Sequence, residues 1–241
     1  MAANESKRLP RRELLAALGA GLGAAFTACA SSPTSATGTG ITTGTSTTGC
    51  AITPSETDGP YPDKTGMLSN AAFFRRDVRE DRIGLSLTLT LTIVNVNDSC
   101  NPVSGANVEM WQCDATGNYS EYSQPGYDGT GKTFLRGLQT TDASGQATFV
   151  TIYPGWYAGR ATHVHVEVFR GVSPVKTTQI AFPEDITRAV YATGVYAPKG
   201  QNPTTNSGDM VFSDGTQREM ATLTGNTSSG YTATLTIGVA I

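Results

Sequence analysis

The only two histidines in the chain, His163 and His165, stand two residues apart. They lie in the run 162–169, which favours a β-strand, and residues i and i+2 of a strand point to the same face. Two imidazoles on one face can bind the same metal ion. The alternative is a chance pair on a solvated or buried face. Glu167 shares this face and could be a third ligand, although we favour a solvated acid or one that supports the ligands from outside.

Two tyrosines lie in loops beside predicted strands, Tyr119 after the run 106–113 and Tyr157 after the run 146–152. Phenolate is an unusual metal ligand, because free tyrosine loses its proton only near pH ~10. A metal that binds two phenolates at neutral pH must therefore be a strong, hard Lewis acid. Ferric iron meets this description and zinc rarely does.

The elements that position these residues follow from a period of two. In the run 85–96, leucine and isoleucine alternate with threonine, which is typical of a strand with one buried face. Further strands are predicted at 106–113, 134–140, 146–152, 162–169, 177–182 and 231–241. We expect the first two strands to form one hairpin, and the next two another. Only about one turn around 186–192 favours a helix. The sequence therefore predicts an all-β protein, an antiparallel β-sandwich with long active-site loops and little helix.

Charge restricts the partner. The chain has a formal net charge of −3 and 15% charged residues. The first 29 residues carry four positive and two negative charges, so their removal leaves a net charge of −5. So few basic residues cannot form a stripe along a phosphate backbone, so we expect no nucleic-acid partner. A small-molecule substrate and one catalytic domain are the expectation for this length.

Residues 1–29 are typical of an export signal. Arg11 and Arg12 precede a short apolar stretch, 14–28, and the order resembles a bacterial twin-arginine signal. A chance arginine pair is the alternative. The segment before Cys29 resembles the cleavage box of lipoproteins, which predicts a lipid anchor on this cysteine, although ordinary signal cleavage also fits. We therefore expect an exported protein, either a cell-surface lipoprotein or a secreted one.

Residues 30–49 are rich in Ser, Thr and Gly and predict a flexible linker, with a disordered propeptide as the alternative. Residues 50–241 then form the catalytic domain. In an oxidising compartment we expect Cys50 to pair with Cys100. About eight extended residues place Cys113 more than ~20 Å from Cys100, beyond disulfide reach, so Cys113 is predicted to be a buried thiol.

Four blocks of the sequence, in order, resemble the intradiol ring-cleavage dioxygenases in their short, exported form. This group is related to catechol 1,2-dioxygenase and protocatechuate 3,4-dioxygenase, and the resemblance runs from about Cys50 to Asp214. The blocks are TPSETDGPY at 53–61, GANVEMWQCD at 105–114 leading to Tyr119, FLRG at 134–137 leading to Thr141 and Asp142, and PGWYAGR at 154–160 followed by His163 and His165. The resemblance implies an Fe(3+) ion held by Tyr119, Tyr157, His163 and His165.

The resemblance also implies the reaction. A catechol binds the iron through both oxygens, Tyr157 leaves the metal and acts as a base, and O2 cleaves the ring between the two hydroxyl-bearing carbons. The product is a cis,cis-muconate-type diacid, and no organic cofactor is required. Arg160 matches the arginine that stabilises the carbanion-like ring, and Gln179 matches a glutamine near the same centre. Tyr61 and Trp156 are expected to line the substrate pocket.

Other features of the sequence fit this resemblance less closely. Arg136 is interpreted as a brace for the loop of Tyr119, and Trp111 and Phe149 as core residues. Only five residues separate Tyr157 from the first histidine, and no helical region precedes the sandwich. The site is therefore expected to be open and tolerant of ring substituents. Two other hypotheses are a non-catalytic β-sandwich binding module of a surface lipoprotein, and a zinc hydrolase that uses both histidines and Glu167.

Overall fold

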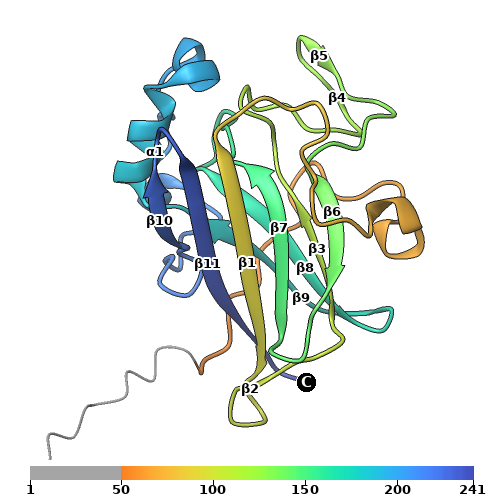
Figure 1. Ribbon diagram of the computed structural model, residues 1–241. Helices are drawn as coiled ribbons and strands as arrows, with labels where there is room; N and C mark the ends of the chain where they lie inside the picture. Colours follow the sequence, from red (N-terminus) through yellow and green to blue (C-terminus); the bar gives the residue numbers. More distant parts are fainter. Residues whose placement is uncertain (1–49) are drawn as a thin grey trace, which may run out of the picture. The chain divides into compact units, whose positions relative to one another are not determined.

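A computed structural model describes residues 50–241 of the chain. Two β-sheets pack against each other, and the β1–β2 turn and the carboxyl terminus lie at the same end of them (Figure 1). The all-β prediction is confirmed. The predicted signal segment at 1–29, with its lipid anchor at Cys29, and the predicted linker at 30–49 lie outside the described residues.

The first sheet has five strands and is built around the long alternating run near residue 90. The central strand pairs with β11 on one side, and with β7 and the short β2 on the other, while β10 pairs with β11. The strands are β1 (Ser86–Asn95), β2 (Asn101–Pro102), β7 (Gln146–Ile152), β10 (Thr222–Asn226) and β11 (Gly230–Val239). The β1–β11 pair is parallel, an exception to the antiparallel prediction, because no short turn forces the two strands to run in opposite directions.

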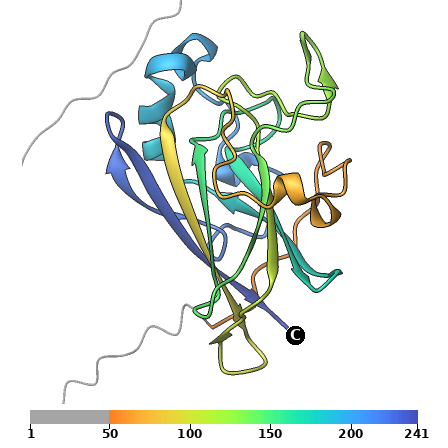
Figure 2. The same cartoon turned by 45° about the vertical axis from the view of Figure 1, so that its right-hand side comes forward.

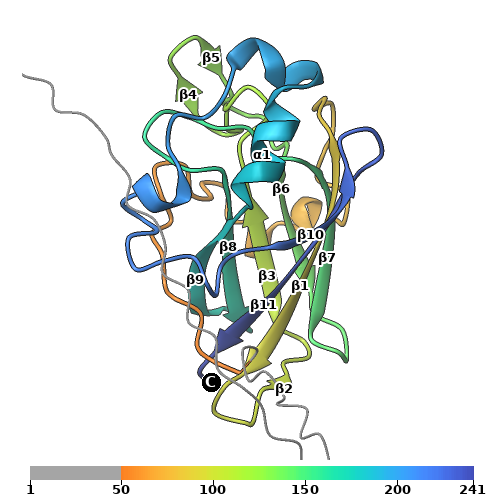
Figure 3. The same ribbon diagram turned by 90° about the vertical axis from the view of Figure 1, so that its left-hand side faces the viewer.

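The second sheet has four antiparallel strands in the order β6, β3, β8, β9. They are β3 (Asn107–Trp111), β6 (Arg136–Thr140), β8 (His163–Arg170) and β9 (Ser173–Ala181). Figure 3 separates the two layers, with β9 and β8 to the left and β1 and β7 to the right. The segment before β1, coloured orange in Figure 2, runs along the four-stranded sheet.

The main hydrophobic core lies between the two sheets. Alternate residues of β1, such as Leu89 and Leu91, share one buried cluster with Val164, Val166 and Val168 of β8. Because successive side chains of a strand point to opposite faces, the residues between these valines turn away from the core. The histidines of β8 therefore lie on the outer face of the four-stranded sheet, where only loops can cover them.

Both predicted hairpins are wrong. The strands β1 and β3 belong to different sheets, as do β6 and β7. After β1 the chain turns back into the short β2 and then crosses to the other sheet. The turn that follows β6 makes the same kind of crossing, and its Gly145 has φ +71 and no room for a Cβ, which would lie 2.6 Å from the Ile93 carbonyl oxygen. A period of two identifies the buried face of a strand, but it does not identify the neighbouring strand.

Short helices and one small hairpin complete the fold. The predicted helical turn is confirmed as α1 (Glu184–Tyr191), which begins two residues earlier than expected and packs Val190 and Tyr191 into the core. Figure 1 shows α1 and the hairpin β4–β5 at one end of the sheets. Within residues 50–241, no helix is long and apolar enough to cross a membrane. The remaining elements are η2 (Met67–Ser69), η3 (Ala71–Phe73), β4 (Ser123–Gln124), β5 (Tyr127–Asp128), η4 (Gly194–Lys199) and η5 (Asn206–Gly208).

The cysteines are arranged as predicted. Cys50 and Cys100 form a disulfide, which ties the start of the described chain to the β1–β2 turn. Cys113 is a free, buried thiol. Burial raises the pKa of the Cys113 thiol to about 12, so it is an unreactive residue of the interior.

Candidate metal centre

The two histidines meet at the beginning of β8. Their Nε2 atoms lie 3.1 Å apart, and both rings are buried. His163 Nδ1 lies 2.6 Å from the Ala161 carbonyl oxygen. A carbonyl can only accept a hydrogen bond, so Nδ1 carries the proton and Nε2 presents a lone pair. This is the arrangement by which a backbone carbonyl orients a metal-binding histidine.

The two predicted tyrosine ligands reach the same point. The hydroxyl oxygen of Tyr119 lies 3.5 Å from His163 Nε2, and that of Tyr157 lies 3.4 Å from it. With metal–ligand bonds of roughly 2.1 Å, neighbouring ligand atoms of one ion lie about 2.9–3.6 Å apart. The spacing of the two oxygens and of His165 Nε2 around His163 Nε2 falls in this range. The structure therefore brings together all four residues predicted to bind the metal.

Burial sets the protonation of these groups. It lowers the pKa of His163 to about 3 and that of His165 well below its usual value, so both imidazoles are neutral at neutral pH. It raises the pKa of Tyr157 to about 12 and that of Tyr119 well above 10. Two phenols with such pKa values keep their protons unless a strong Lewis acid displaces them. The donor set thus fits a hard, highly charged ion such as Fe(3+).

One buried nitrogen of the cluster lacks a partner. Among the described residues, no hydrogen bond is made by His165 Nδ1, while the Nε2 atom of the same ring faces the lone pair of His163. Either neutral tautomer of His165 therefore leaves one ring nitrogen unsatisfied in a buried site. A cation bound between the two rings would remove the conflict at the Nε2 atoms.

Aromatic rings and one glycine enclose the histidines. The Trp111 ring stacks on His165, with centroids 4.8 Å apart and an angle of 3° between the planes. Tyr61 stacks on Tyr119 at 4.6 Å. Gly59 has φ +72, and a Cβ at this position would lie 2.8 Å from Cε1 of His165. The segment 53–61, here named the strap, thus places its last residues directly against His165 and Tyr119.

Trp111 is buried as predicted, but it does not lie in the core between the sheets. It belongs to a second cluster on the outer face of the four-stranded sheet, with Met67, Phe73, Cys113 and Tyr119. The alternation of residues along this strand already indicated the outward position of Trp111. Val108 and Met110 face the core, so the residues that alternate with them, including Trp111, must face outward. Phe149 does lie in the main core, as predicted.

Arg160 and Gln179 lie together, as the resemblance implied. The arginine Nη2 donates to Gln179 Oε1 at 2.5 Å, and Gln179 Nε2 donates to the Thr57 carbonyl oxygen of the strap at 2.7 Å. Arg160 Nε also contacts both carboxylate oxygens of Asp209, at 2.9 and 3.0 Å. The positive charge of Arg160 counters part of the rise in the pKa of Tyr157. Sequence reasoning missed Asp209, because no nearby motif marks it.

Trp156 is held away from this aromatic cluster. Its Nε1 donates to the Gly200 carbonyl oxygen at 3.1 Å, and the Lys199 ammonium lies 4.7 Å from the ring centroid. The ring packs against the main core. In residues 50–241, no ring contact joins Trp156 to the tyrosines or histidines of the centre. Its role in lining the pocket stays a prediction.

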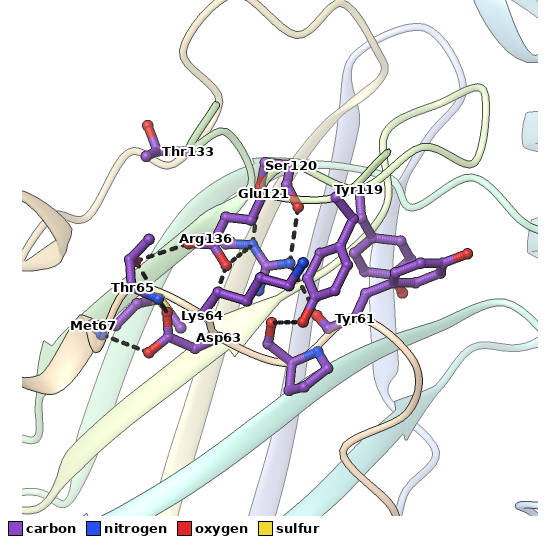
Figure 4. A network of polar contacts seen from close by, with 12 residues as sticks. Tyr61, Asp63, Lys64, Thr65, Met67, Tyr119, Ser120, Glu121, Thr133 and Arg136 are labelled. Carbon is purple, nitrogen blue, oxygen red and sulfur yellow. Dashed lines mark hydrogen bonds and ion pairs between the residues drawn. The ribbon is translucent and has the colours of Figure 1, made fainter. Parts of the chain in front are cut away.

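Arg136 connects the loop of Tyr119 with the segment that carries Tyr61 (Figure 4). Its side chain is fully buried and pairs with Glu121 at 3.4 Å. It donates to Ser120 Oγ at 3.0 Å, to the Ser120 carbonyl oxygen at 3.1 Å and to the Tyr61 carbonyl oxygen at 2.9 Å. The predicted bracing role is confirmed. The brace holds Tyr61 of the strap as well as the loop of Tyr119.

Glu167 does not approach the histidines as a third ligand. It lies opposite Glu109 of β3 and accepts a hydrogen bond from Thr177 Oγ1 at 3.4 Å. Burial, and then the nearby charge of Asp58, raises its pKa. Across residues 50–241, no group of three His, Cys, Asp or Glu ligands includes the two histidines. The geometry thus gives no support to a zinc site of His163, His165 and Glu167.

Comparisons with known proteins agree with this geometry. The family profile described as "Dioxygenase" matches residues 58–197. An intradiol ring-cleavage dioxygenase from Tetranychus urticae is 27% identical with a TM-score of 0.71, over 79% of this chain and 95% of that one. The dioxygenase domain of a carbohydrate-binding fusion protein from Streptomyces sp. SirexAA-E is 26% identical with a TM-score of 0.57, over 79% and 99%.

A third structure shows similarity of fold alone. It is 3-chlorocatechol 1,2-dioxygenase from Rhodococcus opacus, which is 22% identical with a TM-score of 0.51, over 78% of this chain and 72% of that one. A comparison with curated protein sequences gives no match.

Proposed function

Since this chain belongs to the intradiol ring-cleavage dioxygenase family, we propose that it binds one Fe(3+) ion and uses O2 to cleave catechol-type rings between the two hydroxyl-bearing carbons. The proposed ligands are Tyr119, Tyr157, His163 and His165. The observation that carries the proposal is the convergence of two phenol oxygens and one imidazole nitrogen within 3.5 Å of His163 Nε2. Bound Fe(3+) would supply a Lewis acid for both catechol oxygens and make the ring reactive toward O2. The product, a cis,cis-muconate-type diacid, retains both atoms of O2.

The two tyrosines differ in their freedom to take part. Tyr119 is fully buried, and Tyr61 packs on its ring, whereas Tyr157 is partly exposed. We assign to Tyr157 the role of base, since it is the more exposed of the two tyrosines and its phenolate can accept a proton from a catechol hydroxyl. The nearby charge of Arg160 lowers the cost of forming the phenolate.

Arg160 is held in a fixed position for a second task. Asp209 binds its Nε and Gln179 binds its Nη2, so the guanidinium needs little reorganisation when a substrate arrives. A preorganised positive charge stabilises negative charge that develops on the ring as O2 attacks. Gln179 acts as a positioning residue in this arrangement, because it links Arg160 to the strap. Tyr61, which contacts both Tyr119 and Tyr157, is the proposed wall of the substrate pocket.

The proposal is tested on purified, iron-loaded protein. Ferric phenolate absorbs visible light, so we expect a red to burgundy sample with one iron per chain. Oxygen uptake and diacid formation are then followed over a panel of catechol, protocatechuate, hydroxyquinol, and chlorinated and lignin-like catechols. Tyr119→Phe should weaken the visible band and Tyr157→Phe should shift it. A colourless protein with stoichiometric zinc, or one that consumes no oxygen with any catechol, would show that the proposal is wrong.

We also propose that the protein is exported by the twin-arginine route and carries a lipid on Cys29. The Cys50–Cys100 disulfide supports export, because disulfides persist in oxidising compartments and are rare in the cytosol. Mass spectrometry of the amino-terminal peptide, combined with detergent partitioning, tests the anchor. A Cys29→Ala protein that still partitions with membranes would contradict it.

A further inference from the structure

Three carboxylates form a second cluster, which contains none of the tyrosines and histidines of the proposed iron centre. One oxygen of each of Glu56, Asp214 and Glu219 lies within 4.8 Å of the others. They come from separate parts of the chain. Glu56 belongs to the strap, Asp214 to the exposed loop after η5, and Glu219 to the segment whose backbone pairs with Ala181 at the end of β9.

Within residues 50–241, only one oxygen of these three carboxylates accepts a hydrogen bond. Glu219 is fully buried, and its Oε1 accepts a hydrogen bond from Thr178 Oγ1 at 2.9 Å. Its Oε2 is buried and has no hydrogen-bond partner in the described part of the chain. Among residues 50–241, no side-chain hydrogen bond or ion pair is made by Glu56 or Asp214 either. A buried, unpaired carboxylate oxygen is costly, and a native protein normally satisfies it.

The nearby cations do not neutralise the group. Lys176 donates to the Thr53 carbonyl oxygen and to Ser55 Oγ, both at 2.8 Å, and forms no ion pair within 4.0 Å among the described residues. Arg160 pairs with Asp209. When all three carboxylates are ionised, they and the one lysine carry a net charge of −2, which one divalent cation would balance. Burial, Glu56 and Asp214 raise the pKa of Glu219 to about 8, so without a cation this carboxyl group holds a proton at neutral pH, and a bound cation would displace it.

We propose that Glu56, Asp214 and Glu219 form a calcium-binding site. Calcium prefers carboxylate oxygens and binds them at about 2.3–2.6 Å, so two oxygens up to ~5.2 Å apart can share one ion. Three oxygens that are all 4.8 Å apart lie about 2.8 Å from their common centre, so shifts of a few tenths of an ångström allow all three carboxylates to bind one ion. The site is separate from the proposed iron centre in residues and in ligand chemistry.

Bound calcium would link the strap, through Glu56, to the loop that follows η5, through Asp214. The strap already pairs with β9, where Glu56 N donates to the Thr177 carbonyl oxygen at 3.0 Å, and three residues later Gly59 lies against His165. The loop carries Asp209, which binds Arg160. A calcium ion at this place therefore stabilises both segments that flank Arg160, and its main effect is on the stability of the fold.

The test uses purified, iron-loaded protein freed of calcium on a chelating resin, with the visible band as a check that iron is retained. Calcium chloride is titrated by calorimetry, and the Tm is measured with and without it. At a free calcium concentration 100-fold above Kd, the expected rise in Tm is about 5–10 °C for a domain of this size. Asp214→Asn and Glu219→Gln should each lose the binding heat and most of the shift.

Asp98→Asn is the matched control, since it also removes one negative charge from an exposed loop residue but lies in the β1–β2 turn. It should keep the full calcium response. Asp214 is exposed, so Asp214→Asn is not expected to prevent folding. No heat and no change in Tm up to about 10 mM calcium, above the range of weak extracellular sites, would overturn the proposal. So would a Tm that responds to pH near 8 but not to calcium, because the acids would then share a proton.

Discussion

Gly59→Ala is expected to weaken iron binding through a single methyl group. Gly59 has φ +72, a conformation that costs an L-residue about 1–2 kcal/mol. The added Cβ would also lie 2.8 Å from Cε1 of His165, whereas ordinary van der Waals contact begins near 3.4 Å. The strap or the imidazole must therefore move by about half an ångström. Disturbing the residues that support a metal ligand typically costs 10- to 100-fold in affinity, or about 1.4–2.7 kcal/mol.

Gly131→Ala separates the contact from the backbone strain. Gly131 has φ +73, nearly the same as Gly59, but no atom lies within 4 Å of the position of its Cβ. Measured in urea without iron, Gly131→Ala should lose about 1–2 kcal/mol of unfolding free energy from backbone strain alone, and Gly59→Ala should lose this amount plus the cost of the clash with His165. Only Gly59→Ala should also lose iron affinity, measured from the visible band in competition with a chelator. Equal iron affinity in the two variants would refute the reasoning.

Two further predictions concern the histidines and Asp209. The folded-state pKa of His163, about 3, lies below its usual value of 6.5, so the unfolded chain binds more protons below pH 6.5. Its contribution to the stability of the iron-free protein is therefore present above pH 6.5 and is lost as the pH falls toward 3, by about 1.4 kcal/mol per pH unit. The free energy of unfolding in urea, measured between pH 7 and pH 5, should show this dependence on pH. His163→Gln should lower the slope by the amount that one proton contributes, about 1.4 kcal/mol per pH unit. Asp209→Asn should lower kcat for catechol about 10- to 100-fold by releasing Arg160, while the visible iron band is kept. Equal loss of the band would instead indicate a general distortion of the centre.

The sequence predicted the strands and the shared face of the two histidines because both depend on local spacing. The alternation in 85–96 fixes one buried face, and the i, i+2 spacing fixes His163 and His165 on one face of β8. Strand partners depend on how distant segments pack, which is why both predicted hairpins were wrong and the parallel β1–β11 pair was not expected. Asp209 was missed for the same reason, since its function depends on a contact 49 residues away in the chain.

The candidate metal centre lies on the outer face of the four-stranded sheet, and this position explains why the loops that carry its tyrosines must be braced. Val164 and Val166 anchor β8 in the main core, so the positions of the two histidines are fixed by the sheet. The tyrosines, in contrast, come from loops, and a loop has no such anchor. Arg136 supplies one for Tyr119 and Tyr61, because its buried guanidinium is bonded to Ser120 and to the Tyr61 carbonyl oxygen.

Removing the Arg136 side chain should lower the free energy of unfolding by more than the loss of its hydrogen bonds alone would. Arg136→Met leaves the buried carboxylate of Glu121 without its cation, although the backbone N–H of Lys64 and the hydroxyl of Thr65 still donate to it. Breaking a buried ion pair in this way typically costs about 3–5 kcal/mol. The double variant Arg136→Met with Glu121→Gln removes the uncompensated charge and should recover part of that loss in urea unfolding. If the brace also positions Tyr119, the double variant will regain stability without regaining the wild-type visible band. Recovery of both together would show that Arg136 contributes only to stability.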